Sequence, residues 1–152
     1  MSDAKSPVPA DGTAASASAA SIDASFDARA RCMCGQVRIG VRFPSRFCAH
    51  CHCESCRRAH AAGFVTWVGF KSDQVIVTAG TDDLVSYESS PGTSRTFCRR
   101  CGTRMTFSSN KWPGETHVPL ACFDTPVDRD PAGHAFVEER APWIPAPDTA
   151  HG

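Results

Sequence analysis

The stretch CAHCHCESCRR, residues 48–58, places four cysteines and two histidines within eleven positions. Thiols at this density are unsuited to a hydrophobic core and too clustered to form a set of disulfides. In a reducing compartment, such clusters are typical of metal ligands. If all four thiols bind one ion, the site is closed and structural; if only three do, one position stays open for chemistry. The fold and the function both depend on which arrangement holds.

Four further cysteines form two close pairs that could share metal ions with this stretch. They are Cys32 with Cys34 (C-x-C) and Cys98 with Cys101 (C-x-x-C-G). In one pairing, a zinc ribbon joins the C-x-x-C at 53/56 to the one at 98/101, which leaves the C-x-C pair and Cys51 without a role. In the other, the two outer pairs form one four-cysteine site, and the stretch keeps three ligands of its own, Cys51, Cys53 and Cys56. Spacing alone leaves both pairings open.

The composition excludes several classes of protein. The formal net charge is +0 and the sequence pI is near 7.0, so no electrostatic footprint for nucleic acid or anionic lipid is present. No apolar run approaches the roughly 18 residues of a membrane-spanning helix. No secretory signal is recognisable near the N-terminus. A cytoplasmic protein is therefore expected, with its nine cysteines available as thiols.

Short strands are the dominant element expected after residue 35. Seven segments rich in β-branched and aromatic residues are separated by Gly, Pro and Asp: 36–43, 63–70, 73–80, 83–90, 94–98, 103–109 and 117–123. In the first of them Val37, Ile39 and Val41 alternate, which predicts one buried face. Pro119 predicts an edge position for the last strand. The best helix candidate is residues 54–62.

One folded domain between two tails is the expected organisation. Residues 1–30 are rich in Ala and Ser, with few large apolar side chains, which is typical of a disordered tail. Residues 31–145 are expected to form a mostly-β domain of short antiparallel strands with at most one short helix. Metal crosslinks would stabilise its modest core. Residues 146–152 form a short C-terminal tail.

Four motifs carry a resemblance to a known family: CMCGQV (32–37), CHCESCRRAHAAGFVTWVGF (51–70), GTDDLVSYESSPGTSRTFCRRCGTRMTF (80–107) and the final PW (142–143). Together they resemble the glutathione-dependent formaldehyde-activating enzyme family, which also includes centromere protein V. The resemblance implies a zinc-stapled β-tent fold with two zinc ions per chain. It also implies that Cys32, Cys34, Cys98 and Cys101 hold a structural zinc, and that Cys51, Cys53 and Cys56 hold a catalytic zinc.

The activity implied by the resemblance is that of a carbon–sulfur lyase, which joins the thiol of glutathione to formaldehyde. An open zinc position would hold the thiol as thiolate near neutral pH, where a free thiol of pKa about 8.5 is mostly protonated. Glutathione carries two carboxylates, and Arg57, Arg58 and Arg95 are the candidate groups to bind them. The expected partners are thus a small thiol and a small aldehyde. A homo-oligomer is compatible with the sequence.

Two other functions remain as alternatives. A non-catalytic zinc-binding structural or protein-interaction module would use the same scaffold without an open metal position. A thiol–disulfide oxidoreductase is less favoured, because zinc ligation would sequester the thiolates of the C-x-x-C pairs.

The remaining candidates near the cysteines are expected to have supporting roles or none. Strand-like alternation in RFCAHC puts Cys48 on the face opposite Cys51, which predicts that Cys48 is not a ligand. His52 is expected to point away from the metal shared by its neighbours. No role is assigned to His50 or His60. Asp124 is expected to end a strand and cap a turn, with a catalytic carboxylate as the alternative. Cys122 is expected to be a small buried apolar residue.

Overall fold

The computed structural model describes residues 25–147, which form two β-sheets and one α-helix. The smaller sheet has the order β1 (Ala28–Arg31), β2 (Arg38–Val41) and β5 (Val75–Ala79). The larger sheet has the order β10 (His134–Ala135), β3 (Phe47–Cys51), β4 (Val65–Lys71), β9 (Glu115–Pro119), β8 (Arg104–Ser109), β7 (Thr93–Cys98) and β6 (Leu84–Ser90). The helix is α2 (Glu54–His60), and four 3₁₀ turns are η1 (Ser72–Gln74), η2 (Thr81–Asp83), η3 (Leu120–Cys122) and η4 (Val137–Glu139). The predicted mostly-β fold with one short helix is confirmed.

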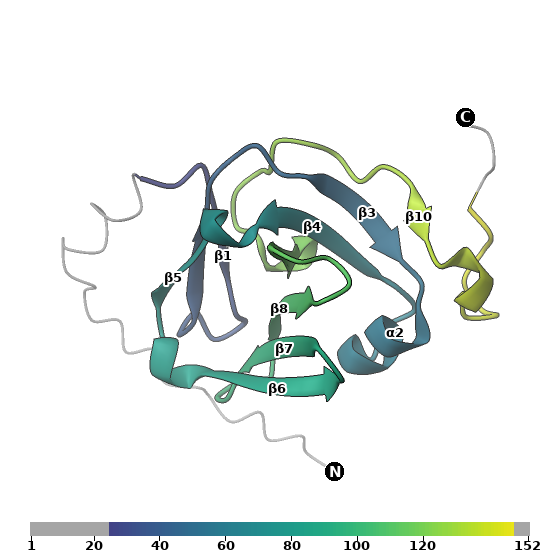
Figure 1. Cartoon of the computed structure of the whole chain (residues 1–152), viewed down its shortest axis with the longest axis horizontal. Helices are drawn as coiled ribbons and strands as arrows, with labels where there is room; N and C mark the ends of the chain where they lie inside the picture. The colour runs from purple at the N-terminus through teal and green to yellow at the C-terminus, as the bar shows by residue number, and fades with distance from the viewer. Residues whose placement is uncertain (1–24, 148–152) are drawn as a thin grey trace, which may run out of the picture.

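The strands pair in an almost wholly antiparallel manner, the exception being the parallel contact of β10 with β3. In Figure 1, β3 and β4 run along the upper side, β6 and β7 run along the lower side, and α2 lies at the lower right, with β10 farther to the right. The smaller sheet closes the opposite end. No helix within residues 25–147 is long and apolar enough to cross a bilayer.

The main core joins the two sheets. Val37, Ile39 and Val41 are buried, as the alternation predicted. They pack in one cluster with Val68 and Phe70 of β4. Because side chains alternate along a strand, Trp67 and Gly69 of the same strand face the other way. The two faces of β4 therefore serve different purposes, one forming the core and one facing the site described below.

A single row of paired residues crosses the larger sheet on that second face. Phe47 of β3 pairs with Gly69 of β4, which pairs with His117 of β9. His117 pairs with Phe107 of β8, and Phe107 pairs with Arg95 of β7. Directly paired residues project from the same face and lie close enough to interact. The row therefore brings aromatic and cationic side chains from five strands together.

Gly69 makes this row possible. A Cβ built on Gly69 would lie 2.1 Å from Cε1 of Phe47, a distance that no real contact tolerates. The Phe47 ring thus lies across the bare backbone of β4 and reaches His117, with ring centroids 4.9 Å apart. A side chain at position 69 would force the two rings apart.

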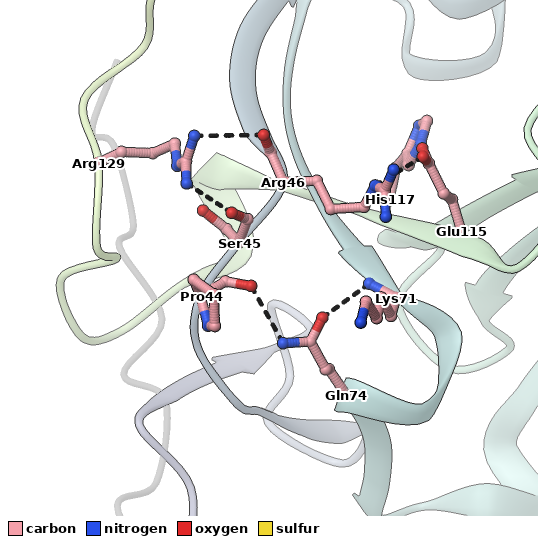
Figure 2. Close-up of polar contacts among 8 residues, drawn as sticks. All are labelled: Pro44, Ser45, Arg46, Lys71, Gln74, Glu115, His117 and Arg129. Atoms are coloured by element: carbon pink, nitrogen blue, oxygen red, sulfur yellow. Dashed lines mark hydrogen bonds and ion pairs between the residues drawn. The ribbon is translucent and has the colours of Figure 1, made fainter.

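Polar contacts fix the segment that leads into β3, and Figure 2 shows them. The guanidinium of Arg129 donates to the carbonyl oxygens of Ser45 and Arg46. On the other side, Nε2 of Gln74 donates to the carbonyl oxygen of Pro44 at 3.0 Å, and Oε1 of Gln74 accepts from the Lys71 amide at 2.8 Å. These bonds connect the entry of β3 to the end of β4, and so help to fix the position of Phe47.

A second set of polar contacts orients His117. Its Nε2 lies 3.1 Å from Oε2 of Glu115, and Oε1 of Glu115 lies 2.7 Å from Nε of Arg46. Burial lowers the pKa of His117, and the hydrogen bond that the Glu115 carboxylate accepts from the imidazole opposes that shift only in part. The imidazole is therefore mostly neutral at pH 7, which suits its place among aromatic rings.

Some sequence-based expectations need correction. Residues 28–30, which were assigned to the N-terminal tail, belong to β1, so the domain begins earlier than the expected residue 31. Residues 1–24 and 148–152, which make up most of the two expected tails, lie outside the described part of the chain. The predicted edge position of the strand that contains Pro119 is wrong, because β9 lies between β4 and β8. Pro119 is the last residue of β9, beyond the single pair with β8, so its missing N–H costs no bond to that strand.

Candidate functional site

The four outer cysteines come together at one end of the fold. Cys32 and Cys34 lie in the turn between β1 and β2, Cys98 ends β7, and Cys101 lies in the turn between β7 and β8. Their four sulfurs all lie within 4.8 Å of one another. The sulfur of Cys34 is 3.4 Å from that of Cys32 and 3.8 Å from that of Cys98. We call these residues the four-thiol group.

Tight turns present these thiols. Gly35 and Gly102, which follow the two cysteine pairs, have positive φ angles of 76° and 78°, a conformation that glycine adopts without strain. The Val37 amide donates to the sulfur of Cys32 at 3.2 Å. A hydrogen bond with Thr103 is the main cause that lowers the pKa of Cys101 to about 5. Cys101 is thus prepared to supply a thiolate to a metal ion.

The second group of sulfurs, Cys51, Cys53 and Cys56, also lies within 4.8 Å. Cys51 ends β3, Cys53 is the N-cap of α2, and Cys56 lies in the first turn of that helix. The sulfur of Cys53 accepts the Cys56 amide at 3.3 Å, which is an N-capping bond made by a thiol. The strand-to-helix turn therefore gathers three sulfurs from one short segment. We call these residues the three-thiol group.

Cys48 lies apart from both groups. It is 2% exposed and belongs to the main core, whereas Cys51 and Cys56 belong to a second buried cluster. β3 extends through Cys51, so the side chains of Cys48 and Cys51 project to opposite faces. The pleat places Cys48 away from the three-thiol group, as the alternation in the sequence indicated.

Within the three-thiol group, Cys56 has the lowered pKa and is the thiol that most readily becomes negatively charged. Hydrogen bonds from the thiols of Cys51 and Cys53 are the main causes that hold the pKa of Cys56 well below its usual range, and Arg95 adds to them. Hydrogen bonds with Cys53 and then Cys56 are the main causes that raise the pKa of Cys51. Cys56 is therefore the thiol of the group that ionises most readily.

Arg95 contacts the sulfur of Cys56. It is 4% exposed, and its Nη2 lies 3.7 Å from the sulfur of Cys56. Its guanidinium carbon lies 4.8 Å from the centre of the Phe107 ring. Its Nη1 has no hydrogen-bond partner among the described residues. Arg95 thus offsets the charge of the thiols and keeps one donor free.

The other two candidate arginines differ in where they point. Arg57 donates to the carbonyl oxygens of His52 and Glu139, and it does not line the cleft described next. Arg58 is exposed at the mouth of that cleft and forms an ion pair of 2.7 Å with Glu54. Binding of substrate carboxylates by these side chains remains a prediction, which the geometry favours for Arg58 and Arg95 over Arg57.

The three-thiol group opens onto a cleft of about 770 Å³. The cleft is bounded by the second face of the larger sheet, by α2 and by the turn at Ser90 and Pro91. None of the cysteines of the four-thiol group lines it. The two groups therefore differ in access, since one faces a cleft large enough for a substrate and the other does not.

The histidines near the cysteines have structural surroundings. Nε2 of His52 lies 2.8 Å from Nδ1 of His134, so the ring turns away from Cys51 and Cys53 as expected. Nδ1 of His50 bonds to the hydroxyl of Thr66 at 2.8 Å. Burial lowers the pKa of His60 to about 4, and its ring packs edge-on against Trp67.

Two further candidates also have local partners. Asp124 forms an ion pair of 2.8 Å with Arg31, and its amide donates to the carbonyl of Arg29. The thiol of Cys122 is buried in η3 and donates to the carbonyl of Arg104 at 3.4 Å. Neither lines the cleft.

Sequence reasoning missed four residues that line the site: Trp67, Phe107, Trp112 and His117. In the sequence, each of these residues resembles an ordinary strand or turn residue. The register of the sheet brings the three strand residues to one face, and the turn between β8 and β9 adds Trp112. The available signal was the alternation V-x-W-x-G in β4, which indicates a common face for Val65, Trp67 and Gly69.

Loss of the Arg95 guanidinium is expected to weaken metal binding at the three-thiol group by about tenfold or more. Arg95 helps to lower the pKa of Cys56. In Arg95→Met that pKa rises, protons compete better for the sulfur, and zinc should be released at a higher pH than in the wild type. Competition with a colorimetric chelator across pH 5–8 measures this. Arg57→Met is the matched control, and equal release in both variants would contradict the prediction.

The fold and the site together define a mostly-β protein with two cysteine clusters that could hold metal ions. The sequence profile described as "Glutathione-dependent formaldehyde-activating enzyme" matches residues 27–139. The chain therefore belongs to the glutathione-dependent formaldehyde-activating enzyme family, as the resemblance of its motifs predicted.

Comparisons with individual proteins support the fold. No curated protein matches the chain at a significant level. Among solved structures, a Rhodobacter sphaeroides protein determined by structural genomics is similar, with a TM-score of 0.59 and 24% identity. The match covers 70% of this chain and 99% of that one. At this identity the likeness concerns the fold alone.

Proposed function

We propose that this protein is a zinc-dependent enzyme of the carbon–sulfur lyase type that joins a thiol to a small aldehyde. Glutathione and formaldehyde are the first candidates, because they are the substrates in the description of the family. One observation carries the proposal: the three-thiol group lies on a cleft, and the four-thiol group does not. Three thiol ligands on an open cleft leave one zinc position free, as in catalytic sites. Four thiol ligands away from the cleft fill all four positions, as in structural sites.

The donor sets fit zinc. A tetrahedral ion with Zn–S bonds of about 2.3 Å requires sulfurs about 3.8 Å apart. In both groups the sulfurs lie within 4.8 Å of one another. Within the four-thiol group, the separations of 3.4 and 3.8 Å from the sulfur of Cys34 are close to the tetrahedral distance. The thiols of the chain are free, which agrees with the proposed reducing, cytoplasmic location.

The proposed reaction forms one C–S bond. Zinc at the three-thiol group, when bound, would supply a position that keeps the sulfur of the substrate thiol ionised near neutral pH. The thiol proton is released, the sulfur adds to the carbonyl carbon, and the carbonyl oxygen gains a proton. In this proposal the unpartnered Nη1 of Arg95 would donate to that oxygen as charge develops on it.

The mouth of the cleft offers cations for a charged thiol such as glutathione. Arg58 and Lys111 line it and are both exposed. Either can bind a carboxylate of the thiol while its sulfur lies at the three-thiol group. Glu54 partly neutralises Arg58, so Lys111 is the less encumbered of the two.

The test combines metal content with adduct formation. We expect about two zinc ions per chain, and faster exchange between ¹³C-formaldehyde and its glutathione adduct than in buffer alone, as measured by NMR exchange spectroscopy. Heat-inactivated protein is the control for unspecific effects. Two zinc ions without acceleration for formaldehyde or for any larger aldehyde would contradict the enzyme hypothesis and favour the alternative, a zinc-binding structural or protein-interaction module.

A further inference from the structure

Five rings form a continuous surface on the sheet side of the cleft. We call the set the aromatic wall; its members are Phe47, Trp67, Phe107, Trp112 and His117. His117 lies at its centre, with ring centroids 4.9 Å from Phe47, 5.3 Å from Phe107 and 6.0 Å from Trp112. Trp67 and Phe107 are 5.7 Å apart. These spacings are those of favourable aromatic pairs.

The aromatic wall begins at the thiols themselves. Cys51 and Cys56 pack in one buried cluster with Trp67 and Phe107. A molecule whose reacting atom meets a sulfur held at the three-thiol group must therefore lie against these two rings. Its immediate surroundings are apolar and flat.

The aromatic wall is preformed. Gly69 leaves the space that the Phe47 ring occupies, and the Glu115 carboxylate holds His117. At the outer end, Trp112 is 37% exposed, so part of its ring is not covered by other residues. A planar ligand can thus bind without rearranging the core, which reduces the entropy cost of binding.

We propose that the aldehyde used at this site carries an aromatic or similar planar apolar group, rather than being formaldehyde. The inference rests on the proposed function and refines its substrate class. Formaldehyde has only two non-hydrogen atoms and would leave most of a cleft of about 770 Å³ unused. Burial of an aryl ring against several aromatic side chains supplies favourable binding energy that a small hydrated aldehyde cannot gain.

If the thiol substrate is glutathione, it is poorly suited to bind against the aromatic wall. Its carboxylates, ammonium and peptide groups would lose hydration against rings that offer them few hydrogen bonds. The charged mouth at Arg58 and Lys111 suits them better. The inner surface then remains for the aldehyde, whose carbonyl carbon must lie beside the sulfur.

With an aryl aldehyde, the same addition reaction remains balanced in atoms and electrons. The C–S bond forms at the carbonyl carbon, the C=O double bond becomes a single bond, and the proton lost by the thiol is regained at oxygen. The product is the thiohemiacetal of an aryl aldehyde. Arg95 stacks on Phe107 of the aromatic wall, lines the same cleft and has no partner for its Nη1 among the described residues, so it is the candidate donor to the carbonyl oxygen.

The test measures binding without any thiol, so that it does not depend on catalysis. Zinc-loaded protein is titrated with benzaldehyde and, separately, with butanal, and binding is followed by saturation-transfer NMR of the aldehyde protons. We expect benzaldehyde to bind at least about tenfold more tightly than butanal. Equal affinities would overturn the proposal, and this comparison needs no variant.

A matched pair of variants locates the binding site. Trp112→Ala is expected to weaken benzaldehyde binding about tenfold, whereas Trp143→Ala, at a tryptophan that is 71% exposed and outside the cleft, leaves it unchanged. Unchanged binding in Trp112→Ala would exclude the aromatic wall. If benzaldehyde binds in this pattern but no thiol adduct forms with any aldehyde, the proposed reaction fails and the apolar ligand site stands.

Discussion

Cys98→Ala is expected to yield insoluble or unfolded protein. Cys98 is fully buried in the main core, and its sulfur contacts that of Cys34, 64 residues earlier in the chain. Zinc bound by the four-thiol group would join the β1–β2 turn to the β7–β8 turn and close that long loop. Zinc in such sites contributes about 10–16 kcal/mol, as much as the whole stability of about 5–15 kcal/mol of an ordinary domain.

The control for this prediction is another buried cysteine. Cys122→Ala removes a thiol from the same core cluster but not from the four-thiol group. Its expected cost is only about 1–2 kcal/mol, typical of a small core truncation, and the protein should stay folded. Solubility, circular dichroism and the melting temperature separate the two variants. A soluble Cys98→Ala protein with an unchanged melting temperature would contradict a structural role for the four-thiol group.

Cys53→Ser is expected to abolish activity while leaving a folded domain with about one zinc ion. The three thiols lie within one short segment, so a metal ion there crosslinks little chain and adds less stability than the ion of the four-thiol group. Serine keeps an oxygen that can cap α2, which preserves the helix. Zinc analysis and the thiol–aldehyde assay measure the two effects.

Cys48→Ala is the matched control for Cys53→Ser. It removes the remaining cysteine of the 48–58 stretch, one that lies on the other face of β3. Both zinc ions and the activity should be retained. If Cys48→Ala loses the zinc of the three-thiol group, Cys48 is a fourth ligand that closes this site. The enzyme hypothesis should then be abandoned in favour of a structural module.

Much of the architecture could be predicted from local patterns. Alternation gave the buried face of Val37, Ile39 and Val41, and it placed Cys48 and Cys51 on opposite faces. The helix was expected at 54–62 and is found at Glu54–His60. These features depend on the side-chain period of one element, which a single sequence contains.

Features that depend on the arrangement of several strands could not be predicted. The interior place of β9 contradicts what Pro119 indicated, because a proline at the end of a strand loses no bond that matters there. The cysteine spacing left two pairings open, and the structure places the sulfurs of Cys32 and Cys98 in one group. The register of β3, β4, β8 and β9 brings together Phe47, Trp67, Phe107 and His117 of the aromatic wall, and no local signal specifies that register.

The spacing of the four-thiol group also constrains how the protein is made. On the ribosome, Cys32 and Cys34 emerge long before their partners, since Cys34 precedes Cys98 by 64 residues. At about 5–20 residues per second, translation of that interval takes roughly 3–13 s. During this time the first pair has no partner thiols, so an oxidant or a competing metal can capture it. The yield of correctly folded protein should therefore depend on zinc supply and redox state during synthesis more than on either condition afterwards.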